Sequence, residues 1–206
     1  IESVISECLQ QFPVLLVTGP RQVGKTTLLQ YVCKNFGYIT FDDPLVLKEA
    51  IEETNLFLIN HKPPLLIDEV QYAPGIFRYL KMYVDKHKIK GSFALTGSQA
   101  FELMKNVSET LAGRMAIIEL KGLSLREMHG IGFYRPFVPN EEYIEERKKF
   151  LSDYTNLWET IHRGSMPELQ DKTINWDRYY SSYVKTYIEK DVRQIVNISD
   201  ELKFIK

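Results

Sequence analysis

The segment GPRQVGKTT at residues 19–27 combines glycines, a lysine and threonines at a spacing that suits phosphate binding. It fits the pattern G-x-x-x-x-G-K-[ST] and follows a short aliphatic run. Gly19 would allow a sharp turn out of a strand, and Gly24 would let the backbone approach a phosphate with no Cβ in the way. The residues between them, which we also expect to line the phosphates, are Pro20, Arg21, Gln22 and Val23.

The residues after the second glycine carry the polar side chains of this predicted site. Lys25 would reach the β- and γ-phosphates, the Thr26 hydroxyl would ligate Mg²⁺, and Thr27 would contact the α-phosphate. The apolar residues that follow have helical spacing, so the turn leads into a helix whose N-terminus attracts anions. A chance glycine-rich turn is the alternative, and the strand before it and the helix after it argue against that alternative.

An acidic pair follows another aliphatic run, in PLLIDE at residues 64–69. We expect Asp68 to serve a hydrated Mg²⁺ and Glu69 to polarise a water for attack on the γ-phosphate. Many strands end in a solvated carboxylate, so the acidic pair alone is weak evidence. Together with the glycine loop it indicates a nucleotide site. A water-activating carboxylate favours a hydrolase over a small-molecule kinase.

Two further candidates lie near predicted strands. Ser98 belongs to LTGSQ, where Thr96, Ser98 and Gln99 would stand at the carboxyl edge of a sheet and sense the γ-phosphate or position water. A plain turn with a helix cap is the alternative. Arg114, in LAGR, would stabilise charge in a phosphoryl-transfer transition state, in cis or from a neighbouring subunit. A surface arginine or a structural ion pair is the alternative.

The elements that must position these residues alternate along the chain. Short apolar runs predict strands, and the segments between them have helical spacing, so we expect a parallel sheet with helical crossovers. The predicted strands are 14–18, 38–41, 64–68, 92–96 and 115–120, and the predicted helices are 1–12, 25–35, 44–59, 74–87 and 99–112.

After residue 120 the pattern becomes helical and loop-like. Ser124 followed by Glu127 predicts a capping box, residues 131–139 read as a loop, and Asn140 predicts a helix N-cap. Residues 175–195 have helical spacing and carry several aromatic side chains, which we interpret as core rather than as a platform for bases. We therefore place a domain boundary near residue 121.

Bulk composition limits the function classes. The chain has 206 residues, 44% of them hydrophobic, and a formal net charge of −1, so nothing indicates bulk nucleic-acid binding. Cys8 and Cys33 have no disulfide or metal-ligand spacing and suit a reducing cytoplasm, where we expect this protein. No apolar run approaches the roughly 20 residues that a membrane helix needs. The chain begins at Ile1 and ends within a helical pattern, so we expect a piece of a longer protein.

The motifs VTGPRQVGKTT, LLIDEVQ, LTGSQ and LAGRMAIIEL, in this order, resemble the AAA+ ATPase domain of a prokaryotic group of predicted ATPases. The resemblance continues through LKGLSLREM, RGSMPE and YVKTYIEKDV, which are similar to the family's linker and to the start of an attached C-terminal domain of unknown function. Gly122 departs from a common proline, and Arg163 precedes one glycine where a pair is common.

The resemblance implies an α/β P-loop NTPase fold, with a five-stranded parallel sheet of order 5-1-4-3-2 flanked by helices and followed by a smaller helical region. It implies an AAA+ ATP-binding domain at 1–121, a helical linker or lid at 122–170, and the start of an incomplete helical C-terminal domain at 171–206. It also implies ATP as the nucleotide, with Ser98 facing the phosphates and Arg114 where AAA+ rings carry an arginine finger. A homo-oligomer formed through Arg114 is therefore one hypothesis, and the resemblance leaves open whether the arginine acts in cis or in trans.

The first functional hypothesis is a Mg²⁺-dependent ATPase whose turnover drives a conformational change in the attached C-terminal domain. The alternative is a slow nucleotide-dependent switch that binds and releases a protein or DNA partner. A nucleic-acid motor is a third hypothesis, but the basic stretches alternate with acidic or apolar residues and indicate solvated helix faces. A P-loop kinase is a fourth, with no evident acceptor site or lid.

Overall fold

The structure is a computed structural model that describes residues 1–98, 110–150 and 156–187. The chain divides into two compact units, Ile1–Lys121 and Gly122–Lys206, and each has its own description below. Across the described residues, none of the helices has the length and apolar character that a membrane crossing requires.

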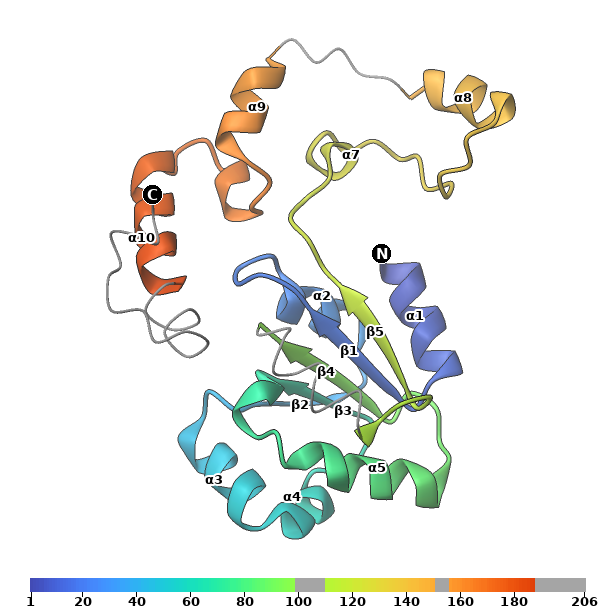
Figure 1. Cartoon of the computed structure of the whole chain (residues 1–206), viewed down its shortest axis with the longest axis vertical. Coiled ribbons are helices and arrows are strands. Elements are labelled where there is room, and N and C mark those ends of the chain that lie inside the picture. The colour runs from blue at the N-terminus through green and yellow to red at the C-terminus, as the bar shows by residue number, and fades with distance from the viewer. Residues whose placement is uncertain (99–109, 151–155, 188–206) are drawn as a thin grey trace. The chain divides into compact units, whose positions relative to one another are not determined.

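The first unit is a parallel sheet with helices on both faces (Figure 1). Its strands stand in the order β2-β3-β4-β1-β5, and every neighbouring pair is parallel, which confirms the predicted fold class and strand order. The strands are β1 (Val14–Thr18), β2 (Gly37–Thr40), β3 (Leu65–Asp68), β4 (Phe93–Gly97) and β5 (Met115–Glu119). The helices are α1 (Glu2–Gln11), α2 (Lys25–Val32), α3 (Pro44–Glu52), α4 (Thr54–Asn60) and α5 (Ile76–His87), with a 3₁₀ turn η1 (Val70–Tyr72) after β3.

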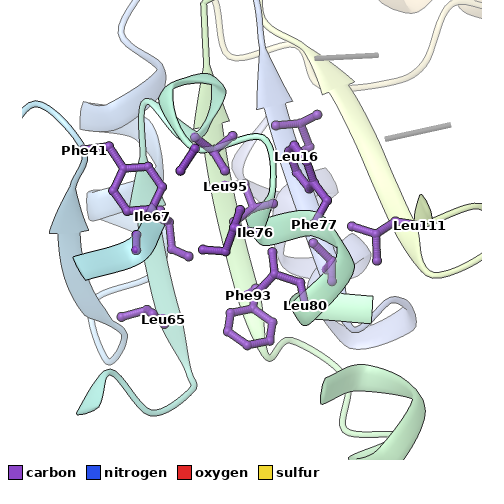
Figure 2. Close-up of a cluster of buried hydrophobic side chains, with 14 of the residues drawn as sticks. Leu16, Phe41, Leu65, Ile67, Ile76, Phe77, Leu80, Phe93, Leu95 and Leu111 are labelled. Carbon is purple, nitrogen blue, oxygen red and sulfur yellow. The ribbon is translucent and has the colours of Figure 1, made fainter. Parts of the chain in front are cut away.

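Alternate residues of the central strands feed two separate cores. Leu16 and Leu95 face α3, α4 and α5, and Figure 2 shows this cluster with Phe77 and Leu80 from α5. Leu15 and its neighbours face α1 and α2 on the opposite side. Because both faces are covered, the central strands read as continuous aliphatic runs, which is why their positions are visible in the sequence.

The helix expected at 44–59 is two helices. Glu53 leaves helical geometry, with φ −130° and ψ 48°, and α4 begins at the next residue. The buried Thr54 hydroxyl donates to the Ala50 carbonyl at 2.7 Å, a local bond that competes with continuation of the helix. The helix expected at 99–112 lies largely outside the described residues.

The second unit contains short helices. They are α7 (Leu125–Met128), α8 (Glu141–Lys148), α9 (Leu157–Arg163) and α10 (Trp176–Tyr187), with a 3₁₀ turn η2 (Glu168–Gln170). The Ser124–Glu127 capping box and the Asn140 N-cap are both present, as predicted. Residues 188–195 of the predicted last helix lie outside the described residues.

Gly19 joins β1 to the phosphate-binding motif at a point where the chain has no room for a side chain. Its φ is +143°, and a Cβ built on it would lie 2.0 Å from the carbonyl oxygen of Leu120, just beyond β5. The first glycine of the motif is therefore required by packing between two strand ends, in addition to the turn that the sequence predicted.

Gly19→Ala should destabilise the protein by about 3 kcal/mol, because the added methyl must displace backbone and the φ value is strained for alanine. Urea denaturation would measure this loss. Gly75→Ala is the control, since Gly75 has φ −61° and a Cβ there meets nothing within 4 Å. Equal unfolding midpoints for the two variants would contradict the packing argument.

Candidate functional site

Three neighbouring strands end at one edge of the sheet, and each is followed by predicted site residues. In the parallel register Thr18 of β1 lies opposite Gly97 of β4, and β4 lies beside β3. Gly19–Thr27, Ser98 and Glu69 therefore leave the sheet at the same edge, where open α/β sheets bind ligands. The topology thus brings most of the predicted site together.

The conformation of the glycine loop was predicted only in part from the sequence. Gly24 has φ 92° and ψ 21° and forms the N-cap of α2, which leaves this helix end without a side-chain acceptor. Gln22 is also left-handed, with φ 63°. The Val23 side chain is buried, Arg21 is half-buried, and Pro20 and Gln22 are exposed. A helix N-terminus with a glycine cap favours an anion.

Lys25 lies inside the curve of this loop. Its side chain is buried, at 7% exposure, and Nζ donates to the carbonyl of Gly19 at 3.0 Å and to that of Pro20 at 2.7 Å. A buried ammonium needs such acceptors, because an unpaired charge away from water is costly. The loop's own backbone therefore holds a positive charge at the site where phosphates are expected.

Asp68 is the common acceptor of the site. The Thr26 hydroxyl donates to its carboxylate, at 2.9 Å from Oδ1 and 3.1 Å from Oδ2. The buried Thr96 hydroxyl donates to Oδ1, and the Tyr38 hydroxyl lies 3.2 Å from Oδ2. The glycine loop and the acidic pair, predicted separately from the sequence, are thus in direct contact.

Tyr38 was absent from the predicted set of site residues, whereas Thr96 was named with Ser98 as a polar group at this edge but without a contact to Asp68. Partial burial of Tyr38 raises the pKa of its phenol, and the nearby Asp68 carboxylate raises it further, so the hydroxyl remains a donor. Thr40 of β2 lies opposite Asp68, which explains how a β2 tyrosine two residues earlier can reach it. The expected strand order already placed β2 and β4 beside β3, and only the register of the strands shows that these two side chains reach Asp68.

Glu69 stands directly after β3 in a left-handed conformation, with φ 55° and ψ 44°. Its backbone N–H donates to the Thr96 hydroxyl oxygen at 3.2 Å. Its carboxylate accepts from the side-chain amide of Gln71, and the same amide nitrogen lies 3.3 Å from Ser98 Oγ. Gln71, which the sequence analysis did not single out, therefore connects two predicted catalytic residues.

Arg114 lies apart from this group. It immediately precedes β5, whose first residue pairs with Val14 at the start of β1, whereas the glycine loop follows the end of β1. A five-residue strand spans roughly 15 Å, so Arg114 is at the opposite edge of the sheet. Its guanidinium forms an ion pair with Asp85 of α5 and lowers the pKa of that carboxyl.

The donors at the site suit a hydrated magnesium ion. The Thr26 hydroxyl gives its hydrogen to Asp68, so its lone pairs can face a cation while the carboxylate accepts from metal-bound water. Within residues 1–98, 110–150 and 156–187, no group of three His, Cys, Asp or Glu side chains could hold a metal ion. A cation here would therefore depend on phosphate oxygens and water for its remaining ligands.

Comparison with known families agrees with this geometry. Residues 11–129, more than half of the chain, match the model of an AAA domain (AAA_14), and residues 154–206 match a domain of unknown function (DUF8612). Uncharacterized proteins of Mycobacterium bovis and Mycobacterium tuberculosis are each 30% identical over 194 residues, which is 93% of this chain. The chain spans only 38% of the length of these relatives.

Solved structures agree on the fold. A DNA replication initiation factor is 14% identical with a TM-score of 0.50, and the match covers 83% of this chain and 58% of that one. AMPPCP-bound DnaA from Aquifex aeolicus is 14% identical with a TM-score of 0.52, and the match covers 91% of this chain and 67% of that one. At this identity the likeness concerns the fold alone.

Proposed function

This chain belongs to the AAA domain family, and we propose that it binds ATP at Gly19–Thr27 and hydrolyses it with Glu69 as general base. The observation that carries the proposal is the contact between Thr26 and Asp68. It joins the phosphate-binding loop to a buried carboxylate on β3, which is the arrangement that phosphoryl-transfer sites of this fold require. The preference for adenine comes from the family.

ATP binding would use a positive charge and backbone dipoles that are already directed at the glycine loop. Lys25 brings a buried positive charge to the loop, and the N-terminus of α2 adds its partial charge. Thr26 and Asp68 would hold a hydrated Mg²⁺, which when bound neutralises charge on the β- and γ-phosphates. Arrival of the phosphates would give Lys25 stronger acceptors than the two loop carbonyls that it contacts.

Hydrolysis would use the residues that follow β3 and β4. The Glu69 carboxylate would accept a proton from a water aligned for attack on the γ-phosphate, and Ser98 would orient the same phosphate. Both residues leave the sheet beside the loop, on adjacent strands. Glu69 is placed there by a left-handed backbone, which turns the chain sharply at the end of β3.

A slow nucleotide-dependent switch is the second candidate function. The observation that favours it is that Lys25 and Glu69 both have partners from the protein itself, the loop carbonyls and the Gln71 amide. Rearranging such contacts in each cycle would slow turnover. In either case we propose that nucleotide state is transmitted through the linker at 122–170 to the C-terminal domain, and from there to a protein or DNA partner in the cytoplasm.

We also propose that Arg114 serves a neighbouring copy of the chain. Its position at the opposite edge from its own loop does not support a role in cis. The exposed ion pair with Asp85 leaves the guanidinium at the surface of the first unit, with 36% of its side chain accessible. A neighbour that docks there would receive a cation near its own nucleotide.

Lys25→Ala should weaken MgATP binding roughly 30-fold, because loss of one charge-assisted contact costs about 2 kcal/mol. Isothermal calorimetry would measure the change, with circular dichroism to establish that the variant is folded. Lys48→Ala is the control, since Lys48 is an exposed lysine on α3 that pairs with Glu52. Unchanged affinity in Lys25→Ala would refute the assignment of the nucleotide site.

Glu69→Gln should keep ATP bound while it lowers kcat by about 10² to 10⁴, because the amide retains the shape and loses the base. Steady-state phosphate release and ATP affinity, measured on the same preparation, separate the two effects. Wild-type turnover in this variant would show that Glu69 is not the base. A wild-type protein that binds ATP without measurable turnover would favour the switch.

A mixing experiment tests Arg114. Arg114→Ala and Lys25→Ala should each be nearly inactive alone, and their mixture should recover activity at shared interfaces, since a finger supplied in trans can contribute about 10³-fold or more. Asp85→Ala is the matched control, because it breaks the same ion pair and keeps the arginine. No recovery after mixing, with assembly shown by sedimentation, would leave Arg114 a structural role.

A further inference from the structure

We propose that Gln71 is a positioning residue that holds the Glu69 carboxylate and links it to Ser98, an inference that rests on the hydrolysis reaction proposed above. Gln71 lies in the 3₁₀ turn η1 directly after β3. One amide nitrogen contacts Glu69 Oε2 and also lies 3.3 Å from Ser98 Oγ. It is thus the bridge between the groups assigned to water activation and to phosphate orientation.

The turn that carries Gln71 is fixed in the core. Val70 is fully buried and Ala73 is 2% exposed, so the residues on both sides of Gln71 anchor η1 in the hydrophobic core. The Tyr72 and Ala73 N–H groups donate to the Glu69 and Val70 carbonyls at 3.1 and 3.2 Å. Gln71 therefore presents its amide from a rigid support, as a positioning group requires.

The chemistry of the contacts determines which way the amide faces. An ionised carboxylate only accepts hydrogen bonds, so the group beside Glu69 Oε2 must be the amide nitrogen. The reversed amide would place its oxygen against the carboxylate. The Oε1 atom of Gln71 is buried with no hydrogen-bond partner in the described structure. Such an acceptor is costly, so the orientation is maintained by the two contacts on the nitrogen side.

The backbone alone does not set the direction of the Glu69 side chain. The left-handed conformation and the N–H bond to Thr96 fix where the residue leaves β3, but the carboxylate lies beyond further rotatable bonds. Gln71 engages Oε2 only, which leaves Oε1 as the oxygen to receive a proton. The side-chain contact supplies the orientation that general-base geometry needs.

The test compares Gln71→Glu and Gln71→Leu with wild type in steady-state ATP hydrolysis, with thermal melts of each protein. Gln71→Glu keeps the shape, replaces the donor by an acceptor and places a like charge against Glu69. Gln71→Leu removes all polar contacts. Both should lower kcat about tenfold, and Gln71→Glu at least as much as Gln71→Leu, with KM for ATP within about twofold of wild type. Gln11→Leu is the matched control, since Gln11 donates to Glu7 at 2.9 Å on the exposed face of α1.

The outcomes separate this inference from the proposed function. Loss of kcat at constant KM and constant melting temperature supports positioning, because a packing role would leave the isosteric Gln71→Glu active. Wild-type kcat in both variants, a rise in kcat, or a change confined to KM would overturn the role of Gln71, while a slow Glu69→Gln enzyme would still uphold the proposed function. Absence of Lys25-dependent turnover in the wild-type protein would overturn both this inference and the proposed hydrolysis.

Discussion

The structure of the site depends on the hydrogen-bond donors that the Asp68 carboxylate needs, because this group is only 7% exposed at the end of β3. A buried carboxylate is tolerated only when donors surround it, and here three hydroxyls do so, from Thr26, Tyr38 and Thr96. Those residues lie on α2, β2 and β4. The contacts that satisfy one charge therefore also fix the glycine loop and two strand ends relative to β3.

Because the strands are parallel, the predicted catalytic residues Glu69 and Ser98 lie at one edge of the sheet, and the Arg114–Asp85 ion pair lies at the opposite edge. Every strand of the sheet points the same way, so residues that follow strands gather at one edge and residues that precede strands gather at the other. The glycine loop, Glu69 and Ser98 belong to the first group, and Arg114 with Asp85 belongs to the second. This separation is the reason why the role that we propose for Arg114 is toward another subunit.

The charged groups of the site are held by the protein itself. Lys25 contacts the carbonyls of Gly19 and Pro20, and Glu69 contacts the Gln71 amide. These contacts hold a buried cation and a carboxylate at the same edge of the sheet, and phosphate binding would have to replace or rearrange them. They also mean that the balance between protein contacts and phosphate contacts would set how fast the site turns over.

The sequence by itself determined the strands, the glycine-rich turn and the position of the acidic pair. Strands buried on both faces appear as aliphatic runs, and the glycine spacing is a local property of the backbone. The order of the strands came from the family resemblance. Only the tertiary structure decided that Gln71 bridges Glu69 and Ser98, and that Arg114 lies at the far edge. Those relations depend on which strands are neighbours and on the register in which they pair. Burial of the whole sheet sets the neighbours and the register, and no local sequence pattern does so.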